Sequence, residues 1–159
     1  MRSPLCSGSG AASSCPRGCG RYVAGVPAIA VHRARIARPT VDLAAARHFY
    51  EDVVGLPVLA EFVDHDGFDG VVFALGDSVQ FELVTDPDGH VPAPTVEDLL
   101  VLALDGPTTA GVTYRLTVHG VTEVGNGTAS VNPYWWRAGA RVFVDPDGYR
   151  VVIVPQDAL

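Results

Sequence analysis

The chain carries the stretch GFDGVVFALGDSVQFELV at residues 67–84, and residues 138–154, AGARVFVDPDGYRVVIV, repeat its plan. Each stretch holds two apolar runs around a short turn rich in Gly and Asp, a pattern typical of a β-hairpin. The turns are Gly76-Asp77 and Asp145–Gly148. A hairpin that closes each half predicts two modules of one plan, with a ligand site in the cleft that they share.

The first half is predicted to form a β-α-β-β-β unit. Residues 29–37 are expected to be its first strand, which ends at Arg38-Pro39-Thr40. Asp42 is a good N-cap and Gly55 a good C-terminal stop for a helix. Apolar residues recur between them at helical spacing: Leu43, Ala46, Phe49, Tyr50, Val53 and Val54. A strand over 56–63, a turn over 64–66 and the first hairpin follow.

The second half is predicted to repeat this order. After a turn-rich linker over 85–92, a strand over 98–104 is expected. Residues 107–120 carry conflicting signals, because Val112, Tyr114, Leu116 and Val118 alternate as in a strand, whereas the repeat requires a helix. The repeat therefore predicts a helix over residues 107–120. A short strand over 121–124, a loop over 125–130 and the second hairpin complete an α+β fold.

Charge is distributed unevenly along the chain. Residues 1–40 contain six arginines and no acidic residue, whereas residues 41–159 contain five arginines and all eighteen acidic residues, a net −13. An acidic domain repels nucleic acid and anionic membranes, so both are excluded as partners. All three cysteines, Cys6, Cys15 and Cys19, precede the expected domain. This distribution gives no disulfide framework and favours a reducing, cytoplasmic location.

Residues 1–29 are expected to form a disordered tail or a segment added by a start codon placed too far upstream. They are rich in Ser, Gly, Ala, Pro and Arg and have no continuous apolar run of the kind a secretory signal needs. The folded domain is expected over 30–157, with modules at about 30–85 and 98–155. Deleting the tail should therefore leave the thermal midpoint unchanged.

Two motifs resemble one superfamily. Asp42-Leu43-x-x-Ala46-x-x-Phe49-Tyr50, followed by Gly55-Leu56, is similar to the first helix of the glyoxalase, bleomycin-resistance and ring-cleaving dioxygenase superfamily, the vicinal oxygen chelate fold. Phe143-x-Asp145-Pro146-Asp147-Gly148-Tyr149 resembles its closing hairpin, and Asn132-Pro133-Tyr134-Trp135 resembles a small bacterial glyoxalase-like branch. The resemblance implies two paired β-α-β-β-β modules that form a cup, and it covers residues 31–155.

The resemblance implies that, in metal-dependent members, four strands each supply one ligand to a divalent metal in the cup. Glu82 matches one of these positions, but Leu99 and Val152 stand at two others. At the fourth, counting back from Arg35 gives Val31, and His32 is one residue out of register. Because catalytic metal sites usually need three protein ligands, a cup without metal is expected. A weak divalent site at His32 and Glu82 is the alternative.

The expected ligand site centres on Glu82, which could accept a proton beside Gln80. Arg35, with Arg33, could hold a ligand carboxylate or pair with Glu82 across the sheet. Tyr134 and Trp135, followed by Trp136, could form an aromatic lid or a plug in the cup. Phe143 of the closing hairpin completes the set. His65, in the turn between two aspartates, is interpreted as a solvated loop residue.

Three functions remain open from the sequence. The first is a cup that binds a small organic molecule without metal, to sequester it or to act on it through Glu82. The second is a metal-dependent lyase, isomerase or dioxygenase that uses His32 and Glu82. The third is a non-catalytic domain with a plugged cup that serves a partner. The sequence does not name the ligand, and it leaves open whether two copies pair as a homodimer.

Overall fold

The computed structural model of the chain describes residues 29–125 and 131–159. The backbone divides into two units, residues 1–30 and residues 31–159, and the fold presented here is that of the second unit. The sequence predictions for residues 1–28, including the three cysteines, and for the loop at 126–130 lie outside the described residues.

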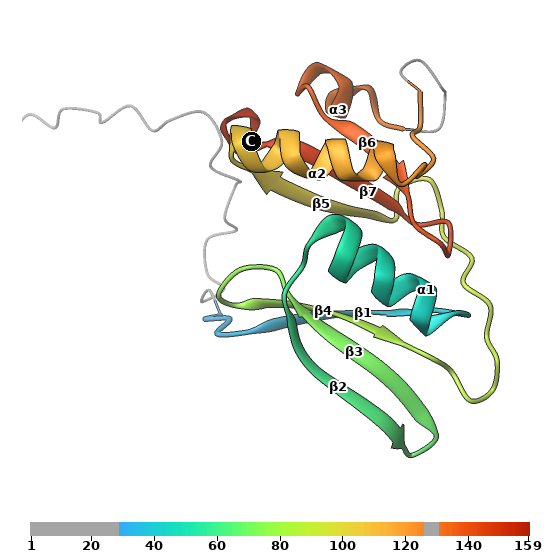
Figure 1. Ribbon diagram of the computed structural model, residues 1–159. Helices are drawn as coiled ribbons and strands as arrows, with labels where there is room; N and C mark the ends of the chain where they lie inside the picture. Colours follow the sequence, from blue (N-terminus) through green and yellow to red (C-terminus); the bar gives the residue numbers. More distant parts are fainter. Residues whose placement is uncertain (1–28, 126–130) are drawn as a thin grey trace, which may run out of the picture. The chain divides into compact units, whose positions relative to one another are not determined.

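The first module contains a four-stranded sheet in the order β1-β4-β3-β2 (Figure 1). β1 runs parallel to β4, and the remaining neighbours are antiparallel. Its elements are β1 (Ala34–Pro39), α1 (Leu43–His48), the π-helical turn η1 (Phe49–Val54), β2 (Val58–His65), β3 (Phe68–Ala74) and β4 (Val79–Val84).

The second module contains a three-stranded sheet in the order β5-β7-β6, again with one parallel pair, β5 and β7. Its elements are β5 (Leu99–Leu104), α2 (Gly106–Val118), α3 (Pro133–Arg137), β6 (Arg141–Val144), β7 (Arg150–Pro155) and η2 (Gln156–Ala158). In place of the strand predicted over 121–124, one bridge joins Glu123 to Phe143. The α+β class predicted from the sequence is confirmed.

The helix over residues 43–54 forms where the sequence places it. The carboxylate of Asp42 accepts a 2.9 Å hydrogen bond from the Ala45 amide, which satisfies one of the unpaired donors at the helix start. Gly55 ends the helix with φ of 93°, a backbone conformation that a side chain would strain. Phe49 and Tyr50 are buried as predicted. Their face of the helix packs on the first sheet.

Residues 106–118 are helical, so the repeat overrides the period-two pattern in this segment. Asp105 caps α2 by accepting a 2.8 Å hydrogen bond from the amide of Thr108. Val112 and Leu116, one turn apart, are buried, whereas Tyr114 is exposed. The alternation in the sequence therefore reflects two faces of a helix rather than two faces of a strand.

The structure corrects the sequence predictions at two strand boundaries and at one helix. The first strand begins at Ala34 rather than Ile29, and the apolar side chains of Ile29 and Val31 are exposed. β2 runs on to His65, through two irregularities in its pairing with β3. The aromatic segment after Asn132, for which no helix was predicted, forms the short helix α3. Asn132 and Pro133 are an N-cap and an N1 residue, which explains the helix locally.

One apolar core serves both modules. It contains Tyr50, Phe73 and Phe81 from the first module and Leu102, Leu116 and Ile153 from the second. α2 also contacts η1 directly, where the Arg115 guanidinium donates 2.8 Å hydrogen bonds to the carbonyl oxygens of Val53 and Val54. The second module thus caps the exposed C-terminal carbonyls of the first module's helix.

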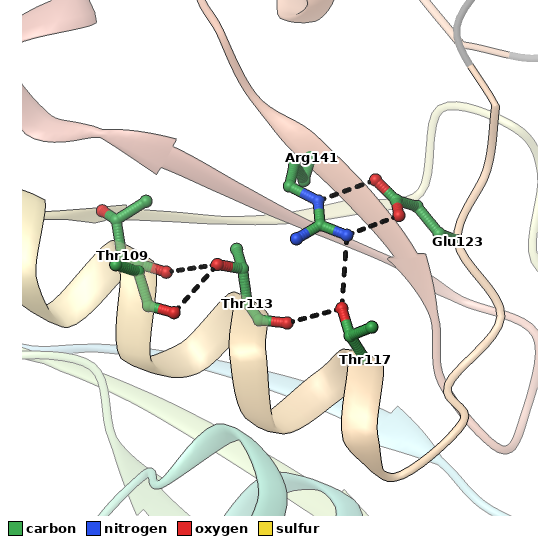
Figure 2. A network of polar contacts seen from close by, with 6 residues as sticks. Thr109, Thr113, Thr117, Glu123 and Arg141 are labelled. Atoms are coloured by element: carbon green, nitrogen blue, oxygen red, sulfur yellow. Dashed lines mark hydrogen bonds and ion pairs between the residues drawn. The ribbon is translucent and has the colours of Figure 1, made fainter.

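A polar network fixes α2 to the edge strand β6 (Figure 2). Thr113 and Thr117 each donate a hydrogen bond to a helical carbonyl one turn earlier. The hydroxyl of Thr117 accepts a bond from Arg141, whose guanidinium also holds the Glu123 carboxylate at 2.6 and 2.8 Å. The network ties helix, bridge and strand together on a half-exposed surface.

Candidate functional site

Three polar side chains meet on the face of the first sheet opposite α1. Along β4, Phe81 and Leu83 point into the core, so Gln80 and Glu82 lie on the other face, here called the inner face. The parallel register places Arg35 of β1 beside Gln80. Strand alternation alone therefore assembles a cluster of Arg35, Gln80 and Glu82.

Arg35 holds the other two members of this cluster. Its Nη1 lies 2.7 Å from Oε2 of Glu82, and its Nε and Nη2 donate to Oε1 of Gln80 at 2.9 and 2.8 Å. The ion pair that the sequence offered as a structural role for Arg35 is present. The Glu82 side chain is 14% exposed and that of Arg35 is 49% exposed. Oε1 of Glu82 accepts no hydrogen bond from the described residues, so it remains available to a ligand.

A depression of about 350 Å³ adjoins Glu82 on this sheet. Its wall is formed by Phe62, His65, Asp66, Phe68, Glu82 and Val84. His65 and Asp66 belong to the β2–β3 hairpin, in which Asp64 and Asp66 have φ of 53° and 54°. Such a backbone is uncommon for residues other than glycine and is enriched at functional sites. His65, which the sequence predicts to be a solvated loop residue, thus lines the depression beside Glu82.

The equivalent face of the second sheet is apolar except at Arg150. Leu99 pairs with Arg150 and Val101 with Val152, which repeats the register of Arg35 with Gln80 and Ala37 with Glu82. Val152 is fully buried in a cluster that includes Trp135 and Trp136 from α3. These tryptophans are partly buried and pack against the inner-face cluster of their own module.

Other sequence-predicted residues lie apart from Glu82. Tyr134 is half-exposed on α3 and contacts Trp135 edge-to-face at 5.1 Å. Phe143 is fully buried in the shared core, so it does not line a ligand site. Arg33 and His32 are exposed and precede β1.

The geometry separates His32 from Glu82. The β1 partner of Glu82 is Ala37, and β1 begins at Ala34. At roughly 3.3 Å per residue, three residues of strand cover about 10 Å, and His32 lies beyond that start. His32 therefore lies outside the strand pairing that positions Glu82.

The positions that hold metal in the resemblance offer one carboxylate and no imidazole. Glu82 is paired with Arg35, and Leu99 and Val152 have no ligand atoms. These side chains do not fit a divalent metal. Elsewhere in the described residues, Asp86, Asp88 and His90 bring three ligand atoms within 4.8 Å of one another in the linker. Asp88 and His90 are exposed, Asp86 is partly buried, and the group lies in the linker after β4.

A second polar cluster joins the two modules within the core. The Tyr50 hydroxyl donates a 2.6 Å hydrogen bond to Oδ2 of Asp145, while Oδ1 of Asp145 accepts from the Tyr149 amide at 2.8 Å. Arg38 stacks on the Tyr149 ring at 4.3 Å. Burial raises the pKa of Asp145 and raises that of Tyr50 well above its ordinary value. The closing hairpin motif is therefore structural, holding the first module's helix.

A larger groove, about 700 Å³, is lined mainly by apolar side chains. It follows β5 from Leu99 to Leu104 and reaches Ile36, Leu56 and Val79 of the first module. Its lining contains no ionisable side chain, so it offers no acid-base group. We therefore place the candidate site at the smaller depression beside Glu82, where ionisable groups converge.

Within the described chain, every helix is too short or too polar to span a bilayer.

Comparisons with known proteins agree with this fold. The model of the YycE-like N-terminal domain matches residues 34–83, and that of the YycE-like C-terminal domain matches residues 97–155. The protein YycE of Bacillus subtilis, itself uncharacterised, is 37% identical over 123 residues, which cover 76% of this chain and 85% of YycE. The crystal structure of YycE from Bacillus subtilis has a TM-score of 0.67 at 34% identity, covering 77% of this chain and 88% of YycE.

More distant structures share the fold alone. Glyoxalase I of Leishmania major has a TM-score of 0.61 at 16% identity, covering 82% of this chain and 88% of its own. The fosfomycin resistance protein FosX of Mesorhizobium loti has a TM-score of 0.58 at 12% identity, covering 76% and 87%. With its two modules and its two matched domains, the chain belongs to the YycE-like family of the glyoxalase-like vicinal oxygen chelate superfamily.

Proposed function

We propose that this protein binds a small organic molecule on the inner face of its first sheet, without the metal that the superfamily's metalloenzymes use. The observation that carries the proposal is the ion pair between Arg35 and Glu82 beside an open depression. The guanidinium supplies the positive charge that a metal would otherwise bring to this carboxylate. Relatives that act as glyoxalases or resistance proteins support the fold rather than the activity.

The side chains around the depression define what such a ligand needs. Oε1 of Glu82 accepts a hydrogen bond from a hydroxyl or amine, and the half-exposed Arg35 donates to a carboxylate or carbonyl. Phe62 and Phe68 provide apolar surface for a ring or a short chain. The proposed ligand therefore carries a donor and an acceptor on a small apolar body. If the protein acts on it, Glu82 accepts the proton.

In this proposal only the first module offers an open face to a ligand. Trp135 and Trp136 pack against the inner-face cluster of the second sheet, whereas no described segment covers the inner face of the first sheet. A second copy of the chain could close this face as a homodimer. Light scattering after size-exclusion chromatography tests for this homodimer, and a monomer at all concentrations would contradict it. A cytoplasmic location, expected from the cysteine-free segment 41–159, is part of the same proposal.

The ligand site can be tested by chemical-shift mapping. A fragment library of small aromatic acids, amines and hydroxy acids is titrated into ¹⁵N-labelled protein. The perturbed amides should cluster at Arg35, Gln80, Glu82, His65 and Phe68. Glu82→Gln and Arg35→Ala should abolish the shifts, whereas Tyr134→Ala, on the second module, should leave them intact. Shifts centred on Leu99–Leu104 would place the site in the apolar groove and contradict the proposal.

A metal-dependent lyase or dioxygenase using His32 and Glu82 was the alternative function. The separation of these two residues along β1 gives it no support.

A further inference from the structure

We propose that His48 and His119 form a second, separate site, which takes a divalent transition-metal ion of the kind that prefers imidazole, such as Zn²⁺, Ni²⁺ or Cu²⁺. His48 is the last residue of α1, in the first module, and His119 is the C-cap of α2, in the second. A metal held by both would connect the two modules at their helices.

The two imidazole rings are already neighbours, in an edge-on arrangement. Their centroids lie 6.1 Å apart, with the ring planes at 61°. Since a nitrogen ligand lies about 2.0–2.1 Å from zinc, two rings that share one ion have centroids roughly 5–6.5 Å apart. The observed separation falls within that interval. The spacing of the two rings is therefore compatible with one shared ion.

Asp52 positions His48 for this role. Its Oδ2 lies 2.8 Å from Nδ1 of His48, one helical turn away. A carboxylate that holds the Nδ1 proton leaves Nε2 with the lone pair that a metal needs, and it fixes the ring orientation. The His119 side chain contacts the His48 ring and no other described polar group. Both histidines and Asp52 are exposed, so water can complete the coordination.

The site lies at an interface that other contacts already hold. Arg115, one turn before His119, donates to the carbonyl oxygens of Val53 and Val54, just beyond Asp52. These two hydrogen bonds hold α2 against η1 close to both histidines. A ligand that binds the folded state and not the unfolded chain stabilises the protein by mass action. Metal at His48 and His119 should therefore raise the melting temperature.

The experiment is a titration of zinc chloride into the untagged full chain, followed by calorimetry and by thermal unfolding. Cys6, Cys15 and Cys19 are replaced by serine in every variant, because thiolates also bind zinc. The parent should bind zinc with a rise in melting temperature that a chelator reverses. His48→Ala and His119→Ala should each weaken binding at least tenfold, and Asp52→Asn should weaken it about tenfold through the orientation of His48.

Two matched variants serve as controls. His65→Ala removes an exposed histidine of the inner-face depression, and His90→Ala disrupts the linker group of Asp86, Asp88 and His90. Both should keep the affinity of the parent. Absence of zinc binding in the parent, full affinity in the double variant His48→Ala/His119→Ala, or loss of binding in His90→Ala alone would each overturn the proposal.

Discussion

The hydroxyl of Tyr50 donates a 2.6 Å hydrogen bond to Oδ2 of Asp145, and this buried contact links the helix of the first module to the closing hairpin of the second. The two residues are 95 positions apart in the chain. They belong to the two motifs that made the superfamily recognisable from sequence. Both motifs thus hold the modules together, and the ligand chemistry is carried by Glu82 and its neighbours.

Removing this hydroxyl should cost measurable stability. Tyr50→Phe keeps the ring in the core but leaves Asp145 with one donor fewer, and a hydrogen bond to a charged group contributes about 1.5–3 kcal/mol. We expect a loss of that size in the free energy of unfolding measured with urea. Tyr114→Phe, on the exposed face of α2, is the matched control and should change it by less than about 0.5 kcal/mol. Equal effects of the two substitutions would contradict the role of the buried bond.

The buried pair of Tyr50 and Asp145 should make the protein less stable at alkaline pH. Burial first, and then the Asp145 charge, raise the pKa of Tyr50 well above its ordinary value of 10.0. The folded state therefore keeps a proton that the unfolded chain releases, so stability should fall as pH rises above 10. Tyr149, whose pKa is also raised, contributes with the same sign. Unfolding measured between pH 9 and 11 should show a shallower fall in Tyr50→Phe than in the parent, and an identical slope would refute the assignment.

The network of Figure 2 predicts a small effect at acid pH. The hydrogen bond from Arg141 lowers the pKa of Glu123 below its ordinary value of 4.5. The contribution of Glu123 to stability is therefore present above its ordinary pKa of 4.5 and is lost as pH falls through its lower pKa in the folded state. Because both side chains are 39% exposed, solvent screening should keep this contribution under about 1 kcal/mol. Glu123→Gln should flatten the acid limb of the stability curve, and a steeper limb would contradict the interaction.

Gly70 is expected to be essential for the shape of the ligand site. A Cβ atom there would lie 2.3 Å from the Phe62 ring, which lines the depression beside Glu82. Gly70→Ala should displace this ring, destabilise the fold by about 1–3 kcal/mol and weaken fragment binding. Gly106→Ala, where a Cβ would meet no atom within 4 Å, is the control. Full fragment affinity in Gly70→Ala would show that Phe62 is not part of the site.

The fold followed from the sequence where local and long-range signals agreed. Asp42 and Gly55 fix both ends of the first helix, and the duplicated hairpins outweighed the misleading alternation in α2. The first strand was misplaced because Ile29 and Val31 are apolar yet exposed, and composition does not reveal burial. The helix α3 could have been found from Asn132 followed by Pro133, the residues of a helix start.

The candidate site was less accessible to sequence reasoning. The contact of Arg35 with Glu82, one of the two roles that the sequence offered for Arg35, follows from the parallel pairing of β1 and β4. His65 was missed because its place beside Glu82 depends on how far β2 extends and on the conformations of Asp64 and Asp66. No local signal in the sequence specifies those two features. Phe143 was wrong as a ligand residue because strand parity turns it into the core.

Metal binding measured in parallel on the parent, Glu82→Gln and His48→Ala/His119→Ala tests the account most directly. Zinc, nickel, manganese and iron are each titrated into chelator-treated protein, with the three cysteines replaced by serine. Because Glu82 is paired with Arg35 and lacks companion ligands at Leu99 and Val152, Glu82→Gln should leave every metal affinity unchanged. Metal binding should disappear instead with His48 and His119. One tightly bound metal per chain that is lost in Glu82→Gln would contradict the metal-free site on the inner face.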